Sequence, residues 1–198
     1  PEQVRLLFPD SVYENSFGTV GIKTESTNPR CKVIEVTTFR TEGAYSDKRR
    51  PDEVKFVKNI EEDLARRDFT INAMAFDLGP VAMSGDVDEE DLDLIDPYGG
   101  QEDLSNKVIR AVGDAGERFG EDALRLMRAV RFHAQLGFTI EKKTGAAIYE
   151  KADLLAEIAS ERVRDELSKL LMTPRAAEGI EMMRTSGLLR FVIPELLD

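Results

Sequence analysis

The hydrophobic pattern of this chain changes once, near Gly113, and this change limits the folds that it can adopt. Before Gly113, the segments FGTVGIKT and KVIEVTTFR are rich in β-branched and aromatic residues with a period of two, which predicts strands. After Gly113, four segments place apolar residues at helical spacing. We therefore predict an α+β fold, with a sheet-bearing domain at residues 1–112 and an all-helical domain at residues 113–198.

Residues typical of element ends mark several boundaries. Asn59 is followed by acidic residues, which predicts the start of a short helix. Ser160 is expected to begin a helix and Gly137 to end one. Three further predictions are a single continuous helix in GEDALRLMRAVRFHAQLGF, a short strand followed by a turn in LIDPYGGQEDLSN, and a last strand in KVIRAV.

Composition narrows the class of protein. The net charge of −11 argues against a polyanionic partner for the chain as a whole, but SDKRR and ARRD are local basic clusters. One cysteine excludes an internal disulfide and, with no apolar run long enough to span a membrane, predicts a cytoplasmic protein without membrane contact. One cysteine and one histidine are too few for a zinc site or a His-based triad, and we expect His133 to be a core or boundary residue.

A row of arginines lies on the predicted helix after Gly113. Arg125, Arg128 and Arg131 recur every three residues, and Asp122 lies one step earlier in the same series. Because residues three apart are neighbours on a helix surface, the three arginines repel one another. The row is therefore either a solvated face or a surface against which an anion binds.

The segment RRDFTINAMAFD is also unusual. Arg66, Arg67 and Asp68 precede a short apolar run that contains Asn72, and an amide inside such a run needs hydrogen-bond partners. From the residues alone, two interpretations remain. The cluster is either an Arg–Asp surface pair with a capping Asn, or part of a ligand site.

Three segments carry a resemblance to a known family: EEDLARRDFTINAMAFD, LIDPYGGQEDLSNKVIRAVGDAGERFGEDALRLMRAVRFHAQLGFTIE and ERVRDELSKLL. In the same order and at similar spacings, they resemble the bacterial-type tRNA nucleotidyltransferases, which add CCA to tRNA 3′ ends, and their relatives the bacterial poly(A) polymerases. The resemblance implies a partial polymerase-like palm, or head, followed by a helical neck. It also implies CTP and ATP as substrates, Mg²⁺ as cofactor and the 3′ end of tRNA as partner.

Other readings of the function remain open. An A-adding enzyme or a poly(A) polymerase of the same family is one alternative, and a non-catalytic nucleotide- or RNA-binding protein is another. The oligomeric state is also open, with a homo-oligomer among the alternatives.

The resemblance assigns roles to individual residues. Arg67 would lie near phosphates, Asp68 would accept a hydrogen bond from the ribose 2′-OH, and Asn72 would lie beside them. Asp122 and Arg125 would read the edge of the base. The two arginines that would face the triphosphate are Arg128 and Arg131, and the residues that would support the site are Arg66, Glu121, Glu161 and Arg164.

The base-reading role has a physical reason. A carboxylate only accepts hydrogen bonds and a guanidinium only donates them. Cytosine and adenine present an amino donor beside a ring-nitrogen acceptor, whereas uracil and guanine present these groups in the reverse order. Asp122 with Arg125 would therefore select C and A, because each mismatched buried group costs about 1–3 kcal/mol.

The family's metal-binding motif, a glycine-rich turn followed by two Asp residues, precedes the segment that PEQVRLLFPD resembles. The resemblance therefore implies a fragment without metal ligands of its own that is inactive alone. Glu35 resembles a further carboxylate of that catalytic site, with a structural strand residue as the equal alternative. The segment TEGAYSDKRRPDEVKF resembles the family's flexible loop, in which Asp47 and Arg50 would make polar contacts.

Overall fold

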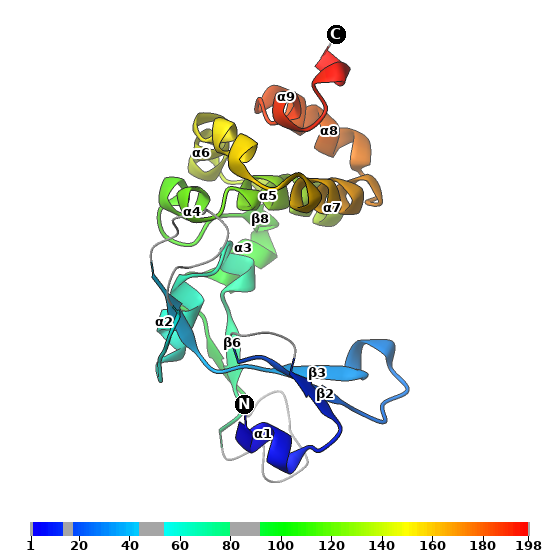
Figure 1. Cartoon of the computed structure of the whole chain (residues 1–198). Coiled ribbons are helices and arrows are strands. Elements are labelled where there is room, and N and C mark those ends of the chain that lie inside the picture. The colour runs from blue at the N-terminus through cyan, green and yellow to red at the C-terminus, as the bar shows by residue number, and fades with distance from the viewer. Residues whose placement is uncertain (1, 14–17, 44–53, 80–91, 198) are drawn as a thin grey trace. The chain divides into compact units, whose positions relative to one another are not determined.

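The computed structural model describes residues 2–13, 18–43, 54–79 and 92–197 (Figure 1). Contacts divide the chain into two units, the first formed by Pro1–Gly43 with Glu53–Asp63 and the second by Ala44–Asp52 with Leu64–Asp198. The described residues form helices and small sheets, which confirms the α+β prediction. The described residues between 64 and 112 belong to the same unit as the later helices, and the domain boundary at residues 112–113 stays a prediction.

The first unit contains short antiparallel sheets. Strands β1, β2 and β3 form one sheet in that order, and β4 pairs with β5. The predicted strands in FGTVGIKT and KVIEVTTFR are confirmed as β2 and β3, whereas the sequence analysis missed α1 and β1. The elements are α1 (Glu2–Leu7), β1 (Ser11–Tyr13), β2 (Val20–Lys23), η1 (Pro29–Cys31), β3 (Val33–Val36), β4 (Arg40–Glu42) and β5 (Val54–Phe56).

Helix α2 (Ile60–Ala65) begins where the sequence predicts. The Oδ1 atom of Asn59 accepts a hydrogen bond from the Glu61 N–H at 2.9 Å, so the predicted cap is confirmed. The chain then passes through the RRD segment into the 3₁₀ turn η2 (Thr70–Asn72).

The segment after η2 contains a helix that the sequence analysis predicted to be a turn. Strand β6 (Ala75–Asp77) pairs with β7 (Asp93–Ile95), and α3 (Gly100–Asn106) follows. The Asp96 carboxylate accepts hydrogen bonds from the Gly100 and Gln101 N–H groups at 2.7 and 2.8 Å, and so caps this helix. The predicted strand in KVIRAV is the two-residue β8 (Val108–Ile109), which pairs in parallel with β9 (Thr139–Ile140).

The predicted continuous helix around the arginine row is wrong. Two helices, α4 (Ala115–Glu121) and α5 (Leu124–Leu136), meet at Asp122, whose backbone is extended with φ −140° and ψ 101°. The Asp122 carboxylate accepts a hydrogen bond from the Leu124 N–H at 3.1 Å, and such local side-chain bonds compete with helical ones. Gly137, with φ 71°, ends α5 as predicted.

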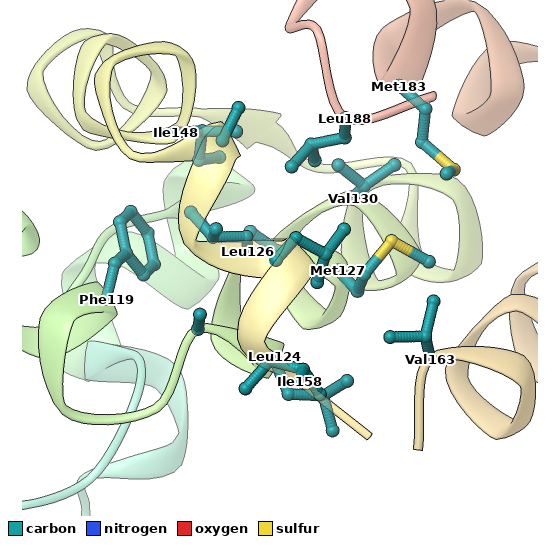
Figure 2. Packing of buried hydrophobic residues seen from close by; sticks show 14 of the residues in the cluster. Phe119, Leu124, Leu126, Met127, Val130, Ile148, Ile158, Val163, Met183 and Leu188 are labelled. Atoms are coloured by element: carbon teal, nitrogen blue, oxygen red, sulfur yellow. The ribbon is translucent and has the colours of Figure 1, made fainter. Parts of the chain in front are cut away.

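The second unit is built around α5, which packs against α7 and α8. Leu126, Met127 and Val130 of α5 are fully buried among residues of the other helices, including Ile148 and Met183 (Figure 2). The remaining elements are α6 (Lys142–Glu150), η5 (Ala152–Glu157), α7 (Ser160–Leu171), α8 (Ala176–Thr185), α9 (Leu189–Val192) and η6 (Pro194–Leu197). Within the described ranges, no helix has the length and apolar character needed to cross a membrane.

Candidate functional site

Each arginine of the α5 row has its own carboxylate. Arg125 lies 2.8 Å from Glu121 at the end of α4. Arg128 lies 2.6 Å from Asp68, between α2 and η2. Arg131 lies 2.6 Å from Glu166 on α7. The repulsion expected within the row is therefore offset by three carboxylates that reach α5 from three separate parts of the second unit.

A pocket of about 580 Å³ opens along one side of this row and lies within the second unit. Its volume is in the range of small-molecule sites. It brings together the RRD segment, Asn72 and the start of α5, which are the two unusual segments of the sequence. The residues that line it are Arg66, Arg67, Asp68, Asn72, Asp122, Leu124, Arg125, Arg128, Phe132 and Arg162.

Asp68 is the most enclosed carboxylate of the pocket, with 9% of its side chain exposed. Its Oδ1 accepts from the Phe69 N–H at 2.9 Å and from the Asn72 side-chain amide at 3.1 Å. Its Oδ2 accepts from Nε of Arg128 at 2.7 Å. The side-chain amide of Asn72 thus has the partner that an amide inside an apolar run needs. The main-chain carbonyl of Asn72 accepts a hydrogen bond from Arg67 at 3.3 Å.

Asp122 pairs with a residue that the sequence analysis missed. Two nitrogens of Arg162 on α7 donate to the two Asp122 oxygens at 3.2 and 2.8 Å. This fork fixes the plane of the carboxylate, which also accepts from the Leu124 N–H. Arg162 lies in the segment ERVRDELSKLL, which carries part of the family resemblance. No local sequence pattern indicates that it pairs with a residue 40 positions away.

Arg125 is held by main-chain carbonyls as well as by Glu121. Its guanidinium donates to the Arg118 and Arg66 carbonyls at 3.1 and 3.0 Å, and the residue is 8% exposed. These bonds use three of the five N–H groups of the guanidinium, and Arg125 also lines the pocket. Base reading by Asp122 and Arg125 stays a prediction.

Arg131 lies outside the pocket lining. Nε of Arg131 donates to Glu166 at 2.6 Å, and Nη1 donates to Gln135 at 2.6 Å. Burial raises the pKa of Glu166, but hydrogen bonds from Lys169 and Arg131 outweigh this effect and hold the pKa below its usual range. The contact with Glu166 binds Arg131 to α7, and its role toward a triphosphate stays a prediction.

A second network missed by the sequence analysis holds η2 in place. The buried Asp103 carboxylate of α3 accepts from the Thr70 hydroxyl at 2.7 Å and from Nε of Arg110 at 2.9 Å. The bond to Asp103 raises the pKa of Arg110. Because Thr70 belongs to the same 3₁₀ turn as Asn72, this network positions one wall of the pocket.

The remaining predicted site residues lie elsewhere. Glu35 is exposed on β3 of the first unit, opposite Gly21, and its catalytic role stays a prediction. Of the predicted supports, Glu161 is exposed and Arg164 pairs with the exposed Asp165 at 3.2 Å. His133 is half-buried with Nδ1 2.7 Å from the Phe138 carbonyl, as expected for a boundary residue. The predicted loop residues, Asp47 and Arg50, lie outside the described residues.

The described residues do not fit a Mg²⁺ site. Among them, no three side chains of His, Cys, Asp or Glu are grouped in a way that could hold a metal ion. The carboxylates of the pocket, Asp68 and Asp122, are instead each paired with an arginine.

Guanidinium groups such as those that line this pocket bind phosphate and carboxylate oxygens in proteins. The chain belongs to the family described as "Poly A polymerase head domain", whose model matches residues 1–110. Residues 137–198 match a second model, described as "Probable RNA and SrmB- binding site of polymerase A".

Curated relatives are bacterial CCA-adding enzymes. The enzyme of Geobacillus kaustophilus is 46% identical over 97% of this chain, and that of Leuconostoc mesenteroides is 48% identical over 92%. The matched regions are 44% and 41% of the two relatives, so the chain spans less than half of their length.

Solved structures with similar folds carry related descriptions. The Bacillus stearothermophilus CCA-adding enzyme in complex with CTP has a TM-score of 0.80 and 41% identity, covering 97% of this chain and 42% of that one. The Thermotoga maritima CCA-adding enzyme complexed with tRNA has a TM-score of 0.72 and 28% identity, covering 98% and 40%.

Proposed function

We propose that this chain is part of a cytoplasmic tRNA nucleotidyltransferase that adds CMP and AMP from CTP and ATP to the 3′ end of tRNA, with Mg²⁺ as cofactor. The observation that carries the proposal is the pocket of the second unit, where Asp122 and Arg125 lie beside Asp68, Arg67 and Arg128. Relatives with 46% and 48% identity are CCA-adding enzymes, and a similar structure contains CTP.

The geometry of Asp122 supports the selection of C and A. Its carboxylate accepts three hydrogen bonds, two from Arg162 and one from the Leu124 N–H, which leaves an acceptor position on Oδ2 for an exocyclic amino group. Arg125 would donate to the neighbouring ring nitrogen. Because Arg162 fixes the Asp122 carboxylate, this side chain does not turn to suit uracil or guanine, and those bases leave buried groups unpaired.

The phosphates would lie against the cations of the same pocket. Arg67 is exposed and Arg128 is one-third exposed, so both can reach a triphosphate whose base contacts Asp122. A guanidinium binds phosphate oxygens through paired N–H groups. One pocket therefore contains donors for phosphates, an acceptor for an amino group and a carboxylate for a sugar hydroxyl.

The activity is tested on the protein at its full natural length, with a tRNA transcript that lacks CCA. In the presence of CTP, ATP and Mg²⁺, we expect the transcript to grow by C, C and A. Addition of A alone, or of a long A tract, would instead identify an A-adding enzyme or a poly(A) polymerase. Binding of CTP without any addition would identify a non-catalytic nucleotide-binding protein.

A pair of variants shows whether the pocket carries the activity. Asp122→Ala is expected to reduce kcat/KM for CTP and for ATP about tenfold, the effect of one hydrogen bond to a charged group. Asp165→Ala is the matched control, because Asp165 is an exposed carboxylate on α7 whose arginine partner is also exposed. Equal kinetics in the two variants would place the nucleotide elsewhere.

A further inference from the structure

The Oδ2 atom of Asp68 is covered by one side chain. Nε of Arg128 donates to it at 2.7 Å, and Nη2 of Arg128 lies 2.6 Å from the same oxygen. The other oxygen, Oδ1, already accepts two hydrogen bonds, from the Phe69 N–H and the Asn72 amide. A carboxylate oxygen has two lone pairs, so a ligand hydroxyl gains a place on Asp68 when a protein donor gives one up.

Arg128 is the donor best able to leave. The Phe69 N–H belongs to the backbone, and Asn72 is fixed in η2, whose Thr70 is bonded to the buried Asp103. The Arg128 side chain is 33% exposed and lines the pocket. Its guanidinium carbon also lies 5.3 Å from the centre of the Phe132 ring, so Asp68 is not its only favourable neighbour.

We propose that Arg128 makes recognition of the sugar hydroxyl depend on the phosphates. Phosphate oxygens of the ligand draw Arg128 away from Asp68, and the 2′-OH then donates to the vacated Oδ2. Without phosphates, Arg128 stays on Asp68 and the hydroxyl has no acceptor there. This inference rests on the proposed function, because it takes the ligand of the pocket to be a ribonucleoside triphosphate.

The test compares four ligands that differ in one group each: CTP, dCTP, cytidine and 2′-deoxycytidine. Their dissociation constants are measured on the protein at its full natural length, by calorimetry for the triphosphates and by ligand-observed NMR for the nucleosides. We expect CTP to bind about tenfold more tightly than dCTP, the effect of one hydrogen bond to a charged group. Cytidine and deoxycytidine should differ by less than about twofold, because Arg128 still covers Oδ2.

Two variants separate exchange from a simple loss of contacts. In Arg128→Ala, Oδ2 of Asp68 is open to every ligand, so cytidine should now bind several-fold more tightly than deoxycytidine while CTP loses affinity. In Asp68→Asn, Arg128 no longer has to leave a carboxylate. We therefore expect dCTP to bind at least about threefold more tightly than it binds the parent, and the ratio of the CTP and dCTP affinities to fall. The control is Arg184→Ala, at an exposed pair on α8, which should change none of these ratios.

The outcomes distinguish this inference from the proposed function. Equal sugar discrimination with and without phosphates would show that Arg128 stays on Asp68 and would overturn the exchange, while leaving CTP binding intact. A weaker affinity of Asp68→Asn for dCTP would overturn it as well. Asp68→Asn keeps the size and shape of the side chain, so it tests the exchange even when Arg128→Ala does not fold. Absence of CTP binding to the parent protein would contradict both proposals.

Discussion

Two ion pairs lie one turn apart on α5 and differ mainly in their exposure to solvent. Arg128 with Asp68 and Arg131 with Glu166 both have a closest contact of 2.6 Å. The Arg128 side chain is 33% exposed and lines the pocket, whereas the Arg131 side chain is 10% exposed and Glu166 only 4%. Of the two arginines, only Arg128 is reached by solvent, and it is therefore the one that we propose exchanges its carboxylate for a ligand.

Losing one member should destabilise the fold more for the buried pair than for the pocket pair. Removing one member of a buried ion pair leaves an uncompensated charge in a region of low polarity. In the pocket pair, the Arg128 side chain can regain water or bind a ligand when it leaves Asp68, whose own side chain is only 9% exposed. The two pairs have the same closest contact, so the exposure of the arginine, and not the length of the ion pair, distinguishes the pair that lines the pocket from the pair that is buried.

The largest expected effect comes from breaking the buried pair. Glu166→Ala leaves Arg131 buried without its carboxylate, and we expect the free energy of unfolding to fall by about 3–5 kcal/mol in urea titrations. The matched control is Glu181→Ala, which breaks an exposed pair with Arg184 on α8 and should change stability little. Similar losses in the two variants would remove the distinction between buried and exposed pairs.

A smaller loss of stability is expected from a substitution that displaces η2, which forms one wall of the pocket. A Cβ atom at Gly100 would lie 2.2 Å from the Thr70 carbonyl and 2.8 Å from Cγ of Met74. Gly100→Ala should therefore cost about 1–3 kcal/mol of unfolding free energy and weaken CTP binding, because η2 has to move.

The control for this variant is Gly120→Ala. The described residues leave open space around a Cβ atom at Gly120, which lies within α4. Alanine is the better helix former there, so this variant should be neutral or slightly more stable. A Gly100→Ala protein with parental stability and CTP affinity would show that the contact between α3 and η2 does not position the pocket.

The next prediction concerns Arg162, which orients the Asp122 carboxylate in the pocket. Arg162→Gln keeps a hydrogen-bond donor near Asp122 but loses the fork that fixes the carboxylate plane. We expect the preference for CTP over UTP to fall about threefold to tenfold in kcat/KM, with a smaller change for overall nucleotide affinity. An unchanged CTP/UTP ratio would limit Arg162 to a structural contact.

The smallest expected effect is the pH dependence of the buried pair. The pKa of Glu166 is lowered in the folded chain because hydrogen bonds from Lys169 and Arg131 outweigh the effect of burial. The unfolded state therefore takes up a proton first, and the stability that Glu166 contributes is complete above its ordinary value of 4.5 and is lost as the pH falls toward the lowered pKa. The slope of unfolding free energy against pH below about 4.5 should be shallower in Glu166→Gln than in the parent. Parallel slopes would mean that other carboxylates dominate the acid transition.

The sequence by itself determined the features that depend on neighbouring residues. The cap at Asn59 and the end of α5 at Gly137 each follow from the preference of one residue for one backbone or capping geometry. Helix α7 begins at Ser160 as predicted, but its N-cap is Ala159, which makes no side-chain hydrogen bond there. The period-two segments became β2 and β3 because β-branched residues pack well on a pleated surface. The RRD segment and the arginine row were recognisable as unusual from their own residue types.

The tertiary structure decided which groups meet. Arg128 and Asp68 are 60 residues apart in sequence, Asp122 and Arg162 are 40 apart, and Arg131 and Glu166 are 35 apart. No local preference specifies such pairs, because they depend on how the region around α5 packs against the RRD segment and against α7 in the second unit. The break at Asp122 combines both kinds of contact, since the Asp122 carboxylate accepts from the nearby Leu124 N–H and from the distant Arg162. Local sequence thus predicted the helical row, and long-range packing decided which of its arginines line a pocket.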